Sequence, residues 1–114
     1  MMLRVLSFLF ILQTTSQLQT VSESAQLIAQ GITVVDVRTT EEFSAGALPG
    51  ALNIPVTDLS FPFQIAKLDK QKPVLIYCKA GGRSARAAIA MKALGFSVIY
   101  ELEGGYRAWE AQKD

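Results

Sequence analysis

The feature that most constrains this 114-residue chain is a short apolar run followed by a glycine-rich loop. Residues 73–77 (PVLIY) include β-branched and aromatic members, which predicts a buried strand. Residues 84–94 are rich in alanine and contain no glycine or proline, which predicts a helix that stops at Gly95. Cys78, the only cysteine, therefore lies where a strand ends and a loop turns into a helix.

The loop has the composition of an anion-binding site, and its members after Cys78 are Lys79, Ala80, Gly81, Gly82, Arg83 and Ser84. Two glycines allow the backbone to turn its N–H groups inward. The first amides of a helix also lack internal partners and carry partial positive charge. A cysteine at the floor of such a loop is favoured as a thiolate, so we expect a lowered pKa for Cys78.

Positive charge is concentrated around this loop. The whole chain has a net charge of +1, yet residues 70–100 contain six basic residues and no acidic one. Such a local field attracts small anions. It gives no support for a nucleic-acid partner, because the basic residues have no interleaved aromatic side chains. The six are Lys70, Lys72, Lys79, Arg83, Arg86 and Lys92.

The chain contains no histidine. This excludes Ser-His-Asp and Cys-His catalysis, and any zinc site with a histidine ligand. A single cysteine also excludes an internal disulfide and a CxxC motif. If Cys78 is an activated nucleophile, backbone amides and nearby cations must activate it.

The sequence CKAGGRS, from Cys78 to Ser84, resembles the active-site loop of the rhodanese family of sulfurtransferases. Other stretches resemble the family's two terminal signatures: DVR, EEF, GALPGA and NIP within residues 36–55, and GGYRAW at residues 104–109. Together they cover residues 18–112. One departure is Ala47, where the family often has histidine, and we interpret it as a variation in loop packing.

The resemblance implies a ping-pong sulfurtransferase in which Cys78 becomes a persulfide. The amides of residues 79–84 would stabilise the anionic sulfur, while Lys79 and Arg83 would hold the sulfonate end of a donor such as thiosulfate. The partners implied are a small sulfur donor and an external acceptor, either cyanide or a cellular thiol. No metal or organic cofactor is implied, and we expect a monomer.

Four alternatives are left open. Cell-cycle phosphatases of the same fold use a Cys–Arg loop, and arsenate reduction by such a loop is a related alternative. Their loop has five residues between Cys and Arg, whereas this chain has four, which gives a cradle better suited to sulfur than to phosphate. The non-enzymatic alternative is a persulfide carrier or anion-binding module without turnover of its own. A lone cysteine can also be an unreactive buried residue.

Three further charged residues are assigned supporting roles: Asp36, Arg38 and Arg86. Asp36 and Arg38 lie at the end of the predicted strand 32–37 and either lie beside the active loop or pin other loops. We favour the second interpretation, with an ion pair to Glu41 or Glu42, because neither residue type is needed to make a sulfur nucleophile.

Residues 1–16 differ from the rest of the chain. Arg4 precedes an apolar run of eight residues and then small polar residues, which is typical of a secretory signal peptide. The run is shorter than the roughly 20 apolar residues of a membrane span. We therefore expect export, for example to the periplasm. The alternative is a cytoplasmic protein with a leader or a first buried strand.

The remaining pattern alternates strands and helices, which predicts an α/β fold with a mostly parallel five-stranded sheet and helices on both faces. In such sheets the site lies at the carboxyl ends of the strands. Ser22 is the expected cap of the first helix, and an apolar patch at residues 61–63 is expected in the core. The other expected strands are 51–54 and 96–100; the expected helices are 23–30, 40–45, one reaching residue 68, and 106–112.

Overall fold

The computed structural model describes residues 16–112. Residues 1–15, which are all but the last residue of the predicted signal peptide, lie outside the described residues, as do residues 113–114. Within the described range, no helix combines the length and hydropathy that a bilayer crossing needs.

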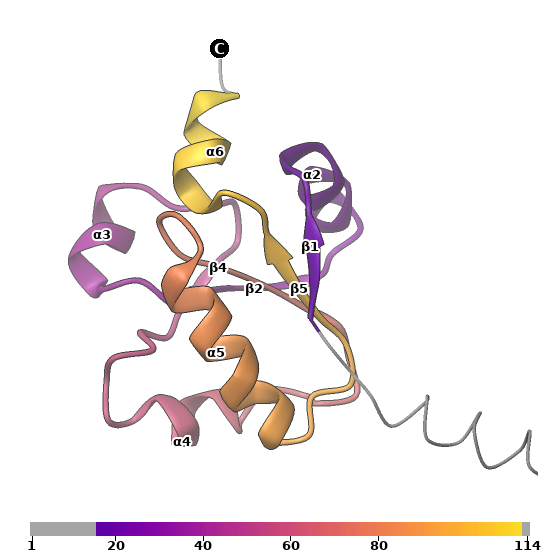
Figure 1. The fold of residues 1–114 in the computed structure, drawn as a ribbon, viewed down its shortest axis with the longest axis vertical. Helices are drawn as coiled ribbons and strands as arrows, with labels where there is room; N and C mark the ends of the chain where they lie inside the picture. Colours follow the sequence, from indigo (N-terminus) through magenta and orange to yellow (C-terminus); the bar gives the residue numbers. More distant parts are fainter. Residues whose placement is uncertain (1–15, 113–114) are drawn as a thin grey trace, which may run out of the picture.

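Five strands form one sheet in the order β1-β5-β4-β2-β3, and every neighbouring pair is parallel (Figure 1). This confirms the predicted α/β class, with a sheet that is parallel throughout rather than mostly so. The strand at the centre is β4, and Cys78 follows it directly. The strands are β1 Gln17–Gln19, β2 Thr33–Asp36, β3 Leu52–Asn53, β4 Val74–Tyr77 and β5 Ile99–Leu102.

Helices cover both faces of the sheet, as predicted. On one face α4 and α5 pack against a buried cluster, and on the other α2 and α6 pack against a second (Figure 1). Helix α3 lies beside the loop that leads into α5. The helices are α2 Val21–Ala29, α3 Thr40–Ala45, α4 Phe61–Ile65, α5 Gly82–Ala93 and α6 Gly105–Ala111.

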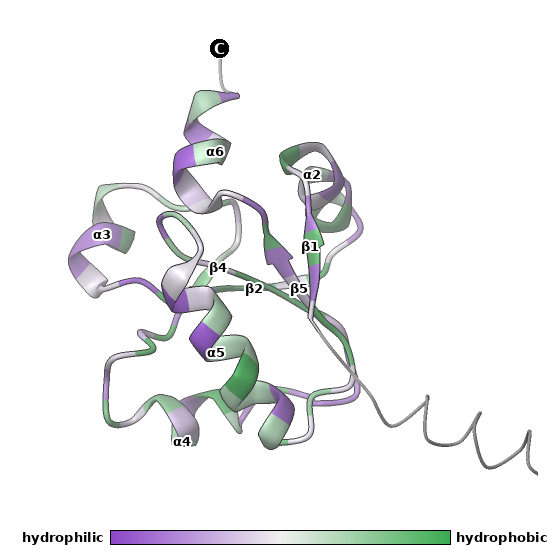
Figure 2. Cartoon of the chain, in the orientation of Figure 1, coloured by the Kyte–Doolittle hydropathy of each residue, from purple (hydrophilic) through white to green (hydrophobic). Residues whose placement is uncertain are grey.

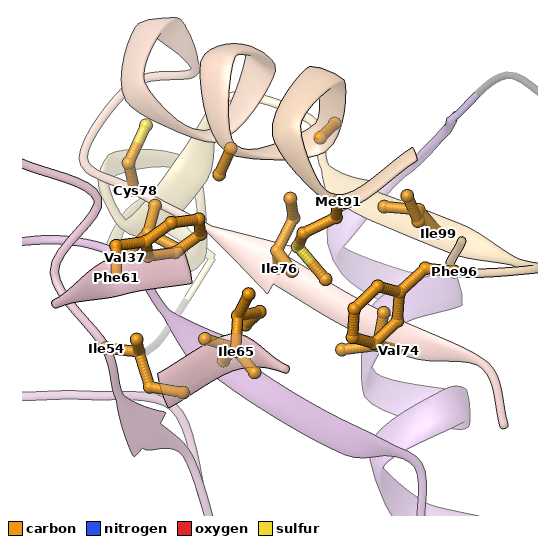
Figure 3. Packing of buried hydrophobic residues seen from close by; sticks show 13 residues of the cluster. Val37, Ile54, Phe61, Ile65, Val74, Ile76, Cys78, Met91, Phe96 and Ile99 are labelled. Carbon is orange, nitrogen blue, oxygen red and sulfur yellow. The ribbon is translucent and has the colours of Figure 1, made fainter. Parts of the chain in front are cut away.

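The larger core cluster lies between the sheet and α5. Met91 and Ile76 are both fully buried there, and the Cys78 side chain lies at one end of the same cluster (Figure 3). Figure 2 shows hydrophobic residues along β2 and β4, whereas α5 alternates polar and apolar residues. A rigid, close-packed core therefore supports the cysteine from below.

Several sequence expectations about individual elements are wrong. The cap of α2 is Thr20, whose hydroxyl accepts from the Glu23 amide in a capping box, and Ser22 lies inside the helix. β5 lies two to three residues later than predicted, because the segment after Gly95 must return to the sheet before it can pair. Phe61 is buried as expected, but Phe63 is 74% exposed. Strand β1 was not foreseen, since three residues give too short a pattern.

We expect Met91→Ala to destabilise the protein by about 2–5 kcal/mol, because it leaves a cavity between α5 and the sheet. The matched control is Ile89→Ala in the same helix, where the side chain is 66% exposed and the cost should be below about 0.5 kcal/mol. Urea unfolding of both variants measures the difference. Equal losses in the two variants would contradict this packing.

Candidate active site

The sulfur of Cys78 is surrounded by hydrogen-bond donors at the start of α5. Cys78 is 1% exposed, and its Sγ accepts from the amide of Gly81 at 3.0 Å and from the amide of Ser84 at 3.3 Å. Its thiol also donates to Ser84 Oγ at 3.7 Å. The sulfur thus lies at the floor of the loop, facing the main-chain N–H groups.

Local backbone geometry explains this arrangement. Gly81, the residue that precedes α5, has a φ of 131°, a conformation that residues with a Cβ rarely adopt. No side chain caps the helix, so its first amides remain available to the sulfur. Gly81 is therefore what allows the amides to converge on the sulfur.

These contacts decide the ionisation of the thiol. Burial raises the pKa of Cys78, since it disfavours the charged form. Hydrogen bonds from the amide and hydroxyl of Ser84, and from the amides of Gly81 and Ala80, act in the opposite direction. The hydrogen bonds outweigh burial, and the pKa of the thiol lies below its ordinary value.

A second helix holds the loop from the other side. The amide of Tyr106 donates to the carbonyl of Cys78 at 2.8 Å, and the amide of Arg107 donates to the carbonyl of Lys79 at 3.0 Å. A Cβ on Gly105 would lie 2.5 Å from the Cys78 carbonyl oxygen. The start of α6 therefore approaches the cysteine loop closely, and it can do so because Gly105 has no side chain.

Arg83 contacts a carboxylate instead of standing free at the mouth of the loop. Its Nη1 and Nη2 donate to the two oxygens of Glu42 at 2.6 and 3.0 Å. The expected ion pair with Glu41 or Glu42 is therefore wrong: Arg38 pairs with Asp36, while Glu42 pairs with Arg83 and ties α3 to α5. A role for Arg83 at the donor's sulfonate stays a prediction, and it requires the guanidinium to be shared with Glu42.

Asp36 and Arg38 pin loops, as the favoured interpretation held, but they pair with each other. Arg38 Nη2 donates to Asp36 at 2.6 Å and to the carbonyl of Gly46 at 2.6 Å, and both charged side chains are buried. The hydroxyl of Tyr77 donates to Asp36 at 2.6 Å. The Arg38 guanidinium also lies over the ring of Tyr106, 4.4 Å from its centroid. This network joins β2, β4 and α6 below the loop.

The other predicted residues lie on the exposed side. Lys79 and Ala80 are exposed in the loop, and Arg86 is exposed one turn into α5. Lys79 borders a hollow of about 310 Å³ whose lining includes Arg107 and Glu42. The loop therefore presents positive charge outward, while its amides face the sulfur.

Sequence patterns missed three contributors to the site: Glu42, Tyr77 and Glu101. Glu42 lies within the EEF stretch, and its spacing from Thr39 is a capping-box signal that could have placed it at the start of α3. Tyr77 carried no signal beyond its apolar strand. Glu101 lies just beyond the expected strand 96–100 but is a buried residue of β5, 8% exposed.

We expect Gly105→Ala to disrupt the site by forcing α6 away from the loop. The new Cβ meets the carbonyls of Cys78 and Lys79, and the φ of 61° is strained for alanine. Stability should fall by about 1–3 kcal/mol, and alkylation of Cys78 at neutral pH should slow. The control is Gly31→Ala, also at positive φ but with open space around it, which should destabilise the protein without changing the reactivity of the thiol.

The ion pair of Glu42 should make stability depend on pH in acid. Hydrogen bonds from Arg83, opposed by burial, lower the pKa of Glu42 from its ordinary 4.5 to about 2. The stabilisation is therefore complete above about pH 4.5 and is lost as the pH falls towards 2.

Comparison with Glu42→Gln tests this, because glutamine keeps the capping box and removes the charge. The free energy of unfolding should differ by about 0.5–1 kcal/mol at pH 6, and the difference should vanish near pH 2. A difference that stays constant over this range would show that the ion pair contributes nothing.

Comparisons with known proteins show the family of this chain. The family model described as "Rhodanese-like domain" matches residues 20–112. The chain is 40% identical over 76 residues to the uncharacterized protein YqhL of Bacillus subtilis, covering 67% of this chain and 59% of YqhL. It is 35% identical over 100 residues to a human thiosulfate:glutathione sulfurtransferase, covering 76% of this chain and 87% of that protein.

A solved structure shows the same fold. The human single-domain sulfurtransferase TSTD1 superposes with a TM-score of 0.75 at 28% identity, over 87% of this chain and 99% of that one. The family match spans the strands from β2 to β5, the cysteine loop and both helices that hold it. The chain therefore belongs to the rhodanese-like domain family.

Proposed function

We propose that this protein transfers sulfane sulfur from thiosulfate, or a donor of the same class, to an external thiophilic acceptor through a persulfide on Cys78. The observation that carries the proposal is the sulfur of Cys78 held by the Gly81 and Ser84 amides, with its thiol pKa lowered. The human relative named thiosulfate:glutathione sulfurtransferase supports thiosulfate as the donor and a thiol as the acceptor.

The first half-reaction is a displacement at sulfur. The Cys78 thiolate attacks the outer sulfur of thiosulfate, the bond between its two sulfurs breaks, and sulfite leaves with the electron pair of that bond. The products are a Cys78 persulfide anion and sulfite, so the total charge is unchanged. Because Cys78 is 1% exposed, the donor must enter with its outer sulfur first and leave its three oxygens at the mouth of the loop.

The loop can stabilise the negative charge that moves during this step. Negative charge passes from Sγ to the added outer sulfur, and the amides that point into the loop stabilise it without reorganisation. Exposed Lys79 offers a cation to the sulfonate oxygens, and Arg83 can add a second where Glu42 shares it. The stabilisation by the amides comes from main-chain atoms and acts on sulfur, so it does not depend on which donor delivers the sulfur.

The second half-reaction returns the enzyme to its starting state. The acceptor, cyanide or a thiolate, attacks the outer sulfur, and Cys78 leaves as a thiolate. Cys78 is the only cysteine, so no second thiol of this chain can resolve the persulfide. The acceptor must therefore enter from outside.

The geometry favours sulfur transfer over hydrolysis of a phosphate ester. A Cys–Arg phosphatase needs its arginine inside the cradle, on the phosphate. Here both ends of the Arg83 guanidinium contact Glu42. The loop also has only four residues between Cys78 and Arg83, which leaves a smaller cradle.

A thiosulfate:cyanide assay tests the proposal. Wild type should form thiocyanate, and Cys78→Ser should lose at least about a thousandfold in rate, because a hydroxyl at neutral pH is a far weaker nucleophile than a thiolate. After thiosulfate alone, wild type should gain roughly 32 Da, one sulfur atom, and the variant none. Wild type that forms neither thiocyanate nor the heavier species would overturn the proposal. Release of phosphate from an aryl phosphate would favour the phosphatase instead.

A further inference from the structure

A buried carboxylate lies behind the reactive sulfur and takes no part in the mechanism above. Glu101, on β5, is 8% exposed. Its Oε1 accepts from the hydroxyl of Ser84 at 3.1 Å, and its Oε2 accepts from the hydroxyl of Ser16 at 2.6 Å. In the described part of the chain, hydroxyls rather than a lysine or arginine therefore satisfy this group.

Ser84 connects this carboxylate to the thiol. The Cys78 thiol donates to Ser84 Oγ at 3.7 Å, and the same hydroxyl donates onward to Glu101. The carbonyl of Gly81 also lies 3.1 Å from Ser84 Oγ, but a carboxylate is the stronger acceptor for the single hydroxyl proton. The three groups form one directed chain: thiol, hydroxyl, carboxylate.

A buried carboxylate is costly unless its charge is used or compensated. A glutamine at this position could contact the same two hydroxyls without that cost, because its oxygen would accept from one and its amide nitrogen would donate to the other. What a glutamate adds is the capacity to take up a proton. In a chain without histidine, this is the group placed to receive the proton of the thiol.

We propose that Glu101 is the proton acceptor for Cys78 and that it acts through the hydroxyl of Ser84. This inference goes beyond the proposed sulfur transfer, because it concerns how the nucleophile is generated and holds for any electrophile that reaches the sulfur. Glu101 does not contact the reacting atoms and acts only through Ser84.

The transfer balances within the chain. The thiol proton passes to Ser84 Oγ as the serine proton passes to Glu101 Oε1, leaving a thiolate, an intact hydroxyl and a neutral carboxylic acid. The Ser84 hydroxyl then donates to the thiolate and accepts from the acid. When the acceptor removes the outer sulfur, Cys78 leaves as a thiolate and the proton returns along the same path.

One proton is therefore shared between two acidic groups. Transfer along the chain of hydrogen bonds moves the negative charge from Glu101 to Cys78 and leaves the net charge of the pair unchanged. Arg83, at the start of α5, is a charged group that also acts on the thiol. The hydrogen bond to Glu42 raises the pKa of Arg83, burial opposes this, and the negative charge of Cys78 adds a smaller increase. Arg83 itself contacts Glu42 of α3.

The test is the pH dependence of Cys78 alkylation by iodoacetamide in the full chain, which reports the thiolate whether or not sulfur is transferred. In wild type the rate should be nearly flat across the range in which the pair holds one proton. In Glu101→Gln the rate should fall about tenfold for each pH unit below the ionisation of the thiol, because only the thiolate reacts. The two curves should converge at high pH.

Three further variants complete the design. Ser84→Ala should also lose the flat region, and the double variant should be no steeper than either single one, because both break the same chain. Glu103→Gln, which removes an exposed charge two residues away, should keep the wild-type curve. Thermal unfolding shows whether each variant is folded.

The inference fails if wild type and Glu101→Gln show the same slope, which would make Glu101 purely structural. It also fails if Ser84→Ala keeps the flat region. The thiosulfate:cyanide activity of wild type is measured in parallel, so either failure leaves the proposed sulfur transfer standing. Conversely, an inactive wild type that retains the flat alkylation curve would refute the transfer and keep the proton acceptor.

Discussion

The site depends on two hydrogen bonds, from the amides of Gly81 and Ser84 to the sulfur of Cys78. They compensate the burial of a thiolate, which by itself would raise the pKa of the thiol. They exist because Gly81 adopts a positive φ and because α5 begins without a capping side chain. A backbone conformation thus lowers the pKa of this thiol, which is what a neighbouring imidazole does in many cysteine enzymes.

The rest of the structure keeps this loop in place. The start of α6 binds the carbonyls of Cys78 and Lys79, which is possible only because Gly105 has no Cβ. Glu42 of α3 holds Arg83 from the outside, and the buried Asp36–Arg38 pair joins the strands beneath. Preorganised donors act well only when they cannot relax, so these contacts are part of the chemistry. In the proposal above, the buried Glu101 receives the proton of the thiol through Ser84.

The fold and the position of Cys78 could be predicted from sequence because their signals are local. An apolar run, an alanine-rich segment and two glycines place Cys78 between a central strand and a helix. The partners of the charged residues could not be predicted. The packing of α3 decides which carboxylate contacts Arg83, and the packing of β5 decides whether Glu101 is buried. Neither packing arrangement can be read from the spacing of residues along the chain. The predicted ends of strands differ from the observed ones for the same reason. Strand β1, for example, is defined only by its pairing with β5.

The central claim is that main-chain amides keep Cys78 ionised. The most direct measurement is the ultraviolet absorbance of the thiolate at pH 7, taken as the difference between wild type and Cys78→Ser. We predict a thiolate fraction well above the few per cent that free cysteine shows at that pH. A fraction equal to or below that of free cysteine would contradict the account.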